Sequence, residues 1–362
     1  MRILLSGGGT AGHINPAIAI AKYAKAQDKD TQILFVGTKK GLERTLVPKE
    51  GFDISFVNVD GLKKELSVKS AVSAAKLMAA VIKSLAVMKR FKPDIVVGTG
   101  GYVCVSSVIA AKILGIPAII HEQNVFPGSA VKFLADKCSV TAISFEESRK
   151  YLKNAGDVRL TGNPIRPSIL EHTKQYCVSR LGAEGSKVIL AFGGSLGAMR
   201  INDVMVEFIK RNKSIKDTVI YFATGKRDFA RVMGEIGDVP PNIKVVEYID
   251  NMDIVMNAAD VVLCRSGAIT LAELCALGKP GILVPSPNVT NNHQEYNARA
   301  LSDRGAAITI TEDEFDVNSL ETALFKIIGD DSYAMDMSRR SRDMGITDAC
   351  EKIYAIMKQL IG

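Results

Sequence analysis

The segment that decides the fold is residues 3–13, which read ILLSGGGTAGH. A short apolar run is followed at once by three glycines, and a helical pattern begins near Asn15. Glycine lets backbone N–H groups approach an anion closely, and a helix N-terminus adds partial positive charge. The segment therefore predicts a strand, a phosphate-binding loop and a helix, although a tight turn without a ligand fits the same residues.

Short apolar runs and helical patterns then alternate along the first half of the chain. Strands are expected at 3–6, 32–36, 54–59, 94–97, 118–121 and 158–160, with helices near 15–27, 68–91, 102–114 and 145–152. Such alternation is typical of a parallel sheet covered by helices on both faces.

The pattern restarts at Lys187. A strand at 187–192 leads into the glycine loop 193–197 and a helix from about Ala198, and further strands are expected at 219–222, 244–246, 261–263, 282–284 and 307–310. Two prolines and a glycine in 161–167 break both helix and strand. We therefore expect an α/β chain with domains at 1–163 and 164–345, and a C-terminal helix at about 346–362 that can pack back on the first domain.

The glycine loops do not match the common nucleotide motifs. The first loop lacks clean G-x-G-x-x-G spacing, no carboxylate follows the second strand at 35–38, and no Lys-Ser or Lys-Thr pair completes a P-loop. Further glycines follow expected strands at 98–101 and 193–197. Loops at the carboxyl ends of parallel strands predict sites for two anionic ligands in a cleft between the domains.

Polar residues at strand ends supply the candidate chemistry. His13 ends the first loop, where a neutral imidazole can take a proton from a sugar hydroxyl, although a lone histidine is more often a packed residue. The segment 121–124, HEQN, fits a binding rim or a polar turn. In 264–273, amides at Ala268 and Ile269 can hold phosphate, and Glu273 can accept two hydrogen bonds from a ribose diol or compensate helix charge.

The charge pattern suggests a surface for anionic partners. The net charge is +7, and no acidic residue occurs between Glu65 and Asp94. Basic residues recur there every seven residues, at Lys69, Lys76, Lys83 and Arg90. Met78 and Ile82 fall on the apolar faces of this helix, and Val81 and Met88 nearer its basic edge. A basic amphipathic helix is typical of membrane-surface binding, although a solvated face over an ordinary core has the same pattern.

Other classes of protein are disfavoured by composition. Trp is absent and aromatic residues make up 6%, so a stacking platform for nucleic acid is not expected. The uncharged run 95–111 contains three glycines and is too short to span a membrane. Six scattered cysteines suggest free thiols in a reducing cytosol. The one D-x-D pattern, 28–30, lies in a polar segment, and we expect no metal and no cofactor.

In combination these motifs resemble the MurG family of N-acetylglucosaminyltransferases. The resemblance spans nearly the whole chain and is carried by GGTAGH (8–13), GGY (100–102), HEQN (121–124), GNPIR (162–166), GGSLGA (193–198), CRSGA (264–268) and Gln294. It implies a GT-B fold, with two Rossmann-like parallel-sheet domains facing a deep cleft. The N-terminal domain would face the lipid acceptor and the membrane, and the C-terminal domain would hold the UDP-sugar.

The resemblance also implies roles for individual residues. On the donor side it implies Arg166, Ser195, Ile249, Ala268, Ile269, Thr270, Leu271, Ala272, Glu273 and Gln294. Near the transferred sugar it implies Thr10, Ala11, Gly12 and Asn124, and for the acceptor pyrophosphate the loops of Gly8, Gly9, Gly100, Gly101 and Tyr102. Ala11 departs from the glycine usual in the family, and a methyl group there narrows the options of the backbone.

The expected reaction is an inverting transfer of N-acetylglucosamine from UDP-N-acetylglucosamine to the C4 hydroxyl of an undecaprenyl-pyrophosphoryl muramyl-peptide. This step belongs to peptidoglycan synthesis, and so to cell shape and division, on the cytoplasmic face of the cell membrane. His13 is the preferred general base and Glu122 the alternative. Rival interpretations are a UDP-N-acetylglucosamine 2-epimerase-like enzyme, a noncatalytic sugar-nucleotide- or lipid-binding protein, and a dehydrogenase.

Overall fold

The computed structural model describes residues 1–58, 68–194 and 197–362, with the side chains of 68–74 left out. It divides into two compact units, and each is considered by itself. Unit 1 comprises Met1–Ile165 and Ile346–Gly362, and unit 2 comprises Arg166–Gly345.

Unit 1 contains a sheet of seven parallel strands in the order β3-β2-β1-β4-β5-β6-β7. Its strands are β1 (Arg2–Gly7), β2 (Gln32–Gly37), β3 (Asp53–Phe56), β4 (Ile95–Gly100), β5 (Ala118–Glu122), β6 (Val140–Ile143) and β7 (Val158–Leu160). Its helices are α1 (Ala11–Gln27), α2 (Glu43–Lys49), α3 (Val68–Phe91), α4 (Tyr102–Leu114), α5 (Ser129–Leu134), the 3-10 helix η1 (Glu146–Tyr151) and α14 (Ala349–Ile361).

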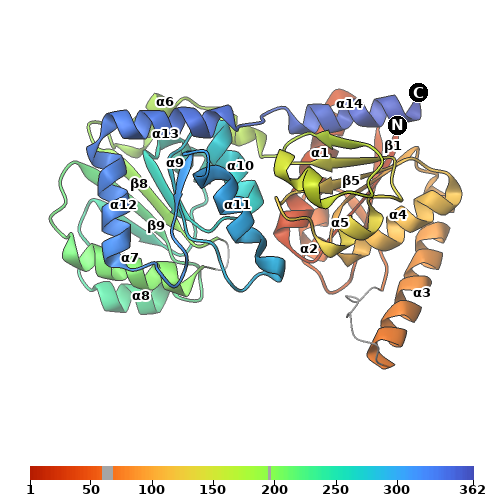
Figure 1. The fold of residues 1–362 in the computed structure, drawn as a ribbon, viewed down its shortest axis with the longest axis horizontal. Coiled ribbons are helices and arrows are strands. Elements are labelled where there is room, and N and C mark those ends of the chain that lie inside the picture. Colours follow the sequence, from red (N-terminus) through yellow and green to blue (C-terminus); the bar gives the residue numbers. More distant parts are fainter. Residues whose placement is uncertain (59–67, 195–196) are drawn as a thin grey trace. The chain divides into compact units, whose positions relative to one another are not determined.

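Alternating side chains of the unit 1 strands feed two separate cores. Leu4 of β1 points into a cluster with α3, α4 and α5, whereas Ile3 and Leu5 point into a cluster with α1, α2 and α14. A strand turns successive side chains to opposite faces, so a run that is apolar throughout requires helices on both faces. The C-terminal helix α14 packs beside α1 and contributes Ile353 and Met357 to the second cluster (Figure 1).

Unit 2 repeats the plan with six parallel strands in the order β10-β9-β8-β11-β12-β13. Its strands are β8 (Lys187–Phe192), β9 (Thr218–Ala223), β10 (Ile243–Val246), β11 (Val261–Cys264), β12 (Gly281–Leu283) and β13 (Ala307–Thr309). Its helices are η2 (Pro167–Leu170), α6 (Lys174–Leu181), α7 (Met199–Arg211), α8 (Phe229–Ile236), α9 (Met252–Ala258), α10 (Ala268–Leu277), η3 (Thr290–Asn292), α11 (His293–Ser302), α12 (Val317–Gly329) and α13 (Asp331–Asp343). Helices α7, α8 and α12 share one hydrophobic cluster with the sheet.

Some local expectations were wrong. The helix after the first loop begins at Ala11 rather than near Asn15, so His13 lies in its first turn. Residues 146–151 form a 3-10 helix rather than an α-helix. In unit 1 three short elements, α2, α5 and β6, were not predicted, and in unit 2 the helices α6, α8, α9, α12 and α13 were not predicted either. The end of the strand expected at 54–59 lies partly outside the described residues, and the strand as described ends at Phe56.

Candidate functional site

The strand order places the glycine loops at matching points of the two sheets. In each sheet, strands run outward in both directions from a central pair, β1 and β4 in unit 1 and β8 and β11 in unit 2. Ligands of open parallel sheets bind beyond the carboxyl ends of such a pair, where the chain connections diverge. The sequence singled out the loops after β1, β4, β8 and β11.

In unit 1 the loops after β1 and β4 lie in direct contact. The Gly8 N–H donates to the Gly100 carbonyl oxygen at 3.3 Å, and a Cβ at Gly101 would come within 2.5 Å of the Gly8 carbonyl oxygen. Gly101 also has φ of 77°, a left-handed conformation that side chains disfavour. Glycine is therefore required where the two backbones meet, and Tyr102, 41% exposed, begins α4 next to this contact.

His13 is fixed by this pair of loops. Its Nδ1 lies 3.0 Å from the Gly8 carbonyl oxygen and 3.4 Å from Thr10 Oγ1, and a Cβ at Gly100 would overlap the ring. A carbonyl oxygen only accepts, so Nδ1 carries the hydrogen, and a neutral ring then has its lone pair on Nε2. The imidazole is thus held in the tautomer that presents a basic nitrogen on the side away from Gly8.

Ala11, the departure from the family pattern, fits its place without backbone strain. It is the first residue of α1 and is not among the residues with positive φ. A methyl group at a helical position is compatible with the backbone, so the structure removes the conformational objection to alanine here. Thr10 is the N-cap residue, and Gly12 follows within the first turn.

The HEQN segment is built into unit 1 by its own polar groups. His121, fully buried, donates from Nε2 to the Gly162 carbonyl oxygen at 2.9 Å and accepts at Nδ1 from the Gln123 amide at 2.9 Å. Burial lowers the pKa of His121 to about 4, against a smaller opposing effect of the Gly162 bond. This histidine is a neutral structural residue rather than part of a binding rim.

The carboxylate of Glu122, like the imidazole of His121, is engaged in hydrogen bonds within unit 1. Its carboxylate accepts from the N–H groups of Asn124 and Gly128, both at 2.8 Å, and from the Asn124 side-chain amide at 3.1 Å. Burial raises the pKa of Glu122 above its usual value, although these N–H groups lower it in part. The arrangement shapes the turn after β5 and orients Asn124.

Sequence reasoning missed Glu43. This carboxylate, fully buried at the start of α2, accepts from the Gly9 N–H at 3.0 Å and from the Thr38 N–H and hydroxyl at 2.8 Å each. Burial raises the pKa of Glu43, but these hydrogen bonds outweigh it, and the pKa lies below its usual value. Thr38 precedes Glu43 in the same loop, but the contact with Gly9 comes from the loop after β1, and no local pattern identifies it.

In unit 2 the loop after β8 is supported from below by a polar network. A Cβ at Gly197 would lie 2.2 Å from the Thr224 carbonyl oxygen, so the loop rests on the end of β9. The amide of Asn202, on α7, donates to that same oxygen at 2.9 Å and to Asp228 at 2.6 Å. Ser195, expected to hold the pyrophosphate, lies outside the described residues.

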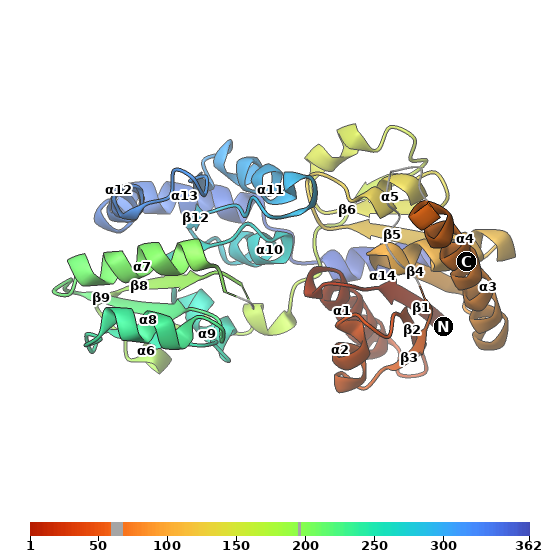
Figure 2. The same cartoon turned by 90° about the horizontal axis from the view of Figure 1, so that it is seen from below.

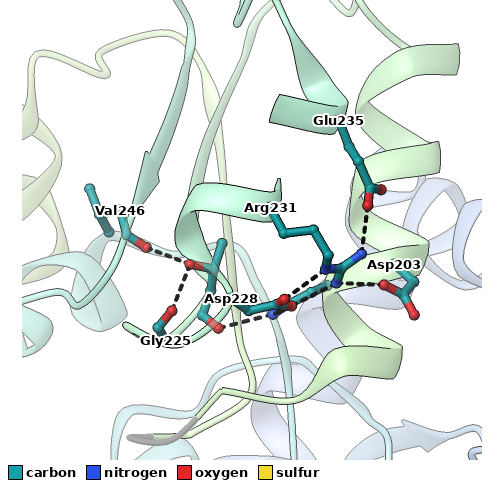
Figure 3. Close-up of polar contacts among 8 residues, drawn as sticks. Asp203, Gly225, Asp228, Arg231, Glu235 and Val246 are labelled. Atoms are coloured by element: carbon teal, nitrogen blue, oxygen red, sulfur yellow. Dashed lines mark hydrogen bonds and ion pairs between the residues drawn. The ribbon is translucent and has the colours of Figure 1, made fainter. Parts of the chain in front are cut away.

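The Arg231 guanidinium completes the network (Figure 3). It bonds Asp228 with two nitrogens at 2.7 Å each, Asp203 at 2.7 Å and Glu235 at 2.8 Å, and thereby joins α7 to α8. Such bidentate, charge-assisted bonds are among the stronger polar contacts in proteins. The network therefore fixes the first turns of α7, where the described loop residues lead into the helix.

A cavity of about 520 Å³ opens above this loop within unit 2. Of the predicted donor residues, Thr270 and Gln294 line it, together with Gly193, Gly194 and Gly197 of the loop. The Gln294 carbonyl oxygen accepts from the Ser286 N–H at 2.9 Å, which orients the side chain. Arg200 and Arg265 also line the cavity and were not predicted as ligand contacts.

These two arginines are held differently. Arg265 forms an ion pair with Glu312 and donates to the carbonyl oxygens of Val284 and Pro285 at 3.1 and 3.2 Å. The Nε atom of Arg200 is buried and has no hydrogen-bond partner among the residues that the structure describes. A buried guanidinium N–H at a glycine loop is suited to an anionic ligand.

Arg166 and Glu273 are brought together, as a bidentate pair. Arg166 Nε lies 2.8 Å from Glu273 Oε1, and Nη2 lies 3.2 Å from Oε2. The Glu273 side chain is only 6% exposed, whereas that of Arg166 is 47% exposed. A carboxylate has about four acceptor positions, so the pair leaves Glu273 capacity for a diol. Neither residue lines the 520 Å³ cavity.

The other predicted donor residues have mixed placements. Ala268, Ile269 and Thr270 form the first turn of α10, where amide groups point toward the helix N-terminus. The Leu271 side chain is buried in the core and its N–H donates to the Gly267 carbonyl oxygen, so the structure gives it a packing role. Ala272 is half-buried on α10, and Ile249 is buried in the segment between β10 and α9.

The basic helix α3 exposes both charge and apolar surface. It packs on α4 through Ala80, Ser84 and Met88, and the Ser84 hydroxyl donates to Ser106 at 3.2 Å (Figure 2). Met88, expected near the basic edge, is therefore buried. Met78 and Ile82 are 68% and 65% exposed, and Lys76, Lys83 and Arg90 are exposed as well. The side chain of Lys69 lies outside the described residues.

Two further expectations concern the whole chain. All six cysteines are free thiols, four of them buried, and burial raises the pKa of Cys104, Cys264 and Cys275 to about 12. Among the helices of the described residues, none combines the length and the apolar character that crossing a bilayer demands.

Two Rossmann-like units, each with a glycine loop at the carboxyl end of its central strands, define the GT-B class of sugar-nucleotide enzymes. The profile described as "Glycosyltransferase family 28 N-terminal domain" matches residues 3–143, and that described as "Glycosyltransferase family 28 C-terminal domain" matches residues 188–358. The chain belongs to glycosyltransferase family 28.

Its relatives within that family are named more narrowly. The chain is 44% identical over 363 residues to the UDP-N-acetylglucosamine--N-acetylmuramyl-(pentapeptide) pyrophosphoryl-undecaprenol N-acetylglucosamine transferase of Acetivibrio thermocellus, covering 100% of this chain and 98% of the relative. It is 43% identical to the protein of that name from Clostridioides difficile, covering 99% and 89%.

Solved structures agree in fold. MurG of Acinetobacter baumannii superposes with a TM-score of 0.80 at 25% identity, covering 99% of each chain. A UDP-GlcNAc 2-epimerase from Neisseria meningitidis superposes with a TM-score of 0.69 at 16% identity, covering 99% of this chain and 100% of the epimerase, and shares the fold alone.

Proposed function

We propose that this protein transfers N-acetylglucosamine from UDP-N-acetylglucosamine to an N-acetylmuramyl-(pentapeptide) pyrophosphoryl-undecaprenol acceptor. The proposal rests on sequence identity above 40%, over the full length of the chain, to transferases named for this reaction. The same step would place the protein in peptidoglycan synthesis.

The test is transfer of radiolabelled sugar from the nucleotide to a synthetic lipid-linked muramyl-pentapeptide, with label counted in the lipid fraction. Label in that fraction supports the proposal. A parallel incubation with UDP-N-acetylglucosamine alone addresses the 2-epimerase, which shares the fold. Formation of the epimer without any lipid-linked label would replace the proposal by epimerisation, and binding without either product would leave a noncatalytic protein.

The donor is assigned to unit 2. Around the 520 Å³ cavity, Gly193, Gly194 and Gly197 and the buried Arg200 Nε supply N–H donors suited to a diphosphate. Glu273 would accept the ribose hydroxyls beside Arg166, and Gln294 would bind sugar hydroxyls. Charge that grows on the leaving diphosphate during transfer would be stabilised by the same donors.

The acceptor is assigned to the loops of unit 1. The acceptor hydroxyl would give its proton to His13 Nε2 while its oxygen attacks the anomeric carbon. The bond from that carbon to the phosphate oxygen breaks, and its electron pair leaves with UDP. Attack from the face opposite to the leaving group inverts the anomeric centre.

His13 is better placed for this role than Glu122. The imidazole holds its hydrogen on Nδ1, directed at Gly8, whereas both oxygens of Glu122 already accept hydrogen bonds. If His13→Ala keeps near wild-type turnover while it still binds UDP-N-acetylglucosamine, His13 is not the base. Glu122→Gln should mainly lower the free energy of unfolding, because the carboxylate of Glu122 holds the turn after β5 and does not act as the proton acceptor of the reaction.

Helix α3 would bind the membrane surface. Exposed Met78 and Ile82 beside Lys76 and Lys83 combine apolar insertion with attraction to anionic lipid. A lipid-linked acceptor requires such a surface contact, and the protein would act as a peripheral protein on the cytoplasmic face.

A further inference from the structure

One peptide group of unit 1 joins two side chains that the proposed mechanism treats separately. The Gly8 carbonyl oxygen and the Gly9 N–H belong to the same amide. The oxygen accepts from His13 Nδ1 at 3.0 Å, and the N–H donates to Glu43 Oε2 at 3.0 Å. A buried carboxylate is therefore connected to the imidazole through a single peptide bond.

An amide transmits polarisation between its two ends. A carboxylate that accepts from the N–H draws the amide toward its charge-separated resonance form, which puts more negative charge on the carbonyl oxygen. That oxygen then accepts more strongly from the imidazole, since hydrogen bonds in a chain reinforce one another at low dielectric. When His13 takes a proton, the positive ring meets a better acceptor.

The surroundings of Glu43 are built for a carboxylate at this point. A Cβ at Gly8, Gly37 or Gly41 would lie 2.6, 2.6 or 2.0 Å from Glu43 atoms, so three glycines make room for its side chain. Thr38 fixes the second oxygen with its N–H and its hydroxyl. The carboxylate also sits in the first turn of α2, where helix amides favour negative charge.

The other groups that the described contacts place around His13 are neutral. Thr10 approaches from the start of α1, Gly100 from the end of β4, and Thr99 donates its hydroxyl to the His13 carbonyl oxygen at 2.7 Å. Cys104, on α4, donates to the Gly101 carbonyl oxygen at 3.0 Å, and its thiol stays protonated because burial raises its pKa to about 12. Among these described contacts, Glu43 brings the negative charge.

We propose that Glu43 is a positioning residue for His13, acting through the Gly8–Gly9 peptide to hold the ring hydrogen on Nδ1 and to stabilise the protonated ring. The proposal rests on the proposed role of His13 as general base. It assigns to Glu43 a part in the reaction, although its carboxylate contacts neither substrate.

The first test is the ring tautomer, observed by two-bond ¹H–¹⁵N correlation NMR in the wild type. The chain has four histidines, and His121 serves as an internal reference because its Nε2 donates to Gly162. We expect neutral His13 to carry its hydrogen on Nδ1, opposite to His121. A wild-type spectrum with the His13 hydrogen on Nε2 overturns the proposal without any variant.

The second test is Glu43→Gln, which keeps the volume and removes the charge. We expect mixed tautomers and a fall of about 0.5–1 pH unit in the midpoint of the His13 titration. Glu50→Gln is the matched control, because Glu50 lies at the end of the same helix and pairs with Lys22 at the surface. A Glu43→Gln spectrum indistinguishable from that of Glu50→Gln overturns the proposal.

Turnover then separates orientation from mere loop structure. Glu43→Gln should lower kcat by about tenfold with little change in KM, and Glu50→Gln should leave both unchanged. An unshifted His121 signal would verify that unit 1 is folded. Should Glu43→Gln not fold, Glu43→Asp retains the charge but shortens its reach, and a His13 tautomer and titration equal to wild type would count against the relay.

The same experiments distinguish a failure of the proposal for Glu43 from a failure of the proposed role of His13 as general base. If His13→Ala turns over normally while the wild-type ring still has its hydrogen on Nδ1 and responds to Glu43→Gln, the relay exists but His13 is not the base. If His13→Ala is inactive and the His13 NMR signals do not respond to Glu43→Gln, His13 remains the base. The proposed action of Glu43 through the Gly8–Gly9 peptide is then wrong.

Discussion

At the scale of single residues, hydrogen-bond partners distant in the chain decide what a side chain can do. His13 and His121 belong to the same unit, yet His13 donates from Nδ1 to Gly8 and His121 donates from Nε2 to Gly162. The sequence placed both at strand ends, and its preference for His13 as the base did not rest on the hydrogen bonds of the two rings. The difference follows from which ring nitrogen faces a carbonyl oxygen.

His121 should make the stability of unit 1 depend on pH. Its pKa of about 4 in the folded chain lies below the ordinary 6.5, so the unfolded chain binds the proton more readily. The contribution is complete above about pH 6.5 and is lost as the pH falls toward 4, by about 2 kcal/mol between pH 7 and 4.5. Urea unfolding of unit 1 at both pH values should show a smaller loss for His121→Gln than for the wild type. An equal loss in both proteins would contradict the assignment.

Glu273, which pairs with Arg166, should contribute directly to the affinity for the nucleotide. Replacing its carboxylate by an amide in Glu273→Gln weakens hydrogen bonds to a ribose diol, and we expect about tenfold weaker binding of UDP. Calorimetric titration measures this directly. Glu171→Gln, an exposed acid of the same unit, is the control and should bind like wild type. Equal affinities for all three proteins would remove Glu273 from the donor site.

At the scale of elements, periodicity and glycine position predicted most of both sheets because their strands are apolar throughout and end in loops. In unit 1 the elements that escaped prediction are short, whereas in unit 2 the unpredicted helices include α12 and α13, with 13 residues each. Helix α2 contains Pro48 and only seven residues, and β6 has four, so tertiary packing rather than local pattern forms them. Missing α2 also meant missing Glu43. The contact of Glu43 with Gly9 joins loops 34 residues apart in the sequence, which no local pattern reveals.

Helix α3 carries the prediction that belongs to this scale. Charge reversal at Lys76, Lys83 and Arg90 should lower binding to vesicles of phosphatidylglycerol and phosphatidylcholine by at least about tenfold, since each basic group near anionic lipid contributes about 1 kcal/mol. Met78→Ser with Ile82→Ser should weaken the same binding by removing the inserted side chains. Vesicle co-sedimentation measures both.

Met335→Ser is the matched control for the apolar variants, because Met335 is 66% exposed on α13 of unit 2. It should bind vesicles like wild type. Binding by the α3 variants that equals this control would assign Met78, Ile82 and the basic stripe to an ordinary solvated face.

At the scale of the whole molecule, two units repeat one plan with unrelated residues. Each starts from a strand, a glycine loop and a helix, and each places that loop at the centre of its sheet. The restart at Lys187 made this organisation predictable. The fold pattern alone does not name the acceptor, because a sugar-nucleotide fold serves transferases and epimerases alike, and the expected acceptor came from the resemblance of the motifs. Similarity over the full chain supports the narrower proposal.

The most direct measurement is the anomeric configuration of the disaccharide made from UDP-N-acetylglucosamine and a synthetic undecaprenyl-type muramyl-pentapeptide, read by NMR after purification. Attack by the acceptor hydroxyl opposite to the departing UDP predicts a single lipid-linked product in which the new bond is β, inverted from the α bond of the nucleotide. An α-linked product would contradict the displacement described here, and the absence of any lipid-linked disaccharide would contradict the function itself.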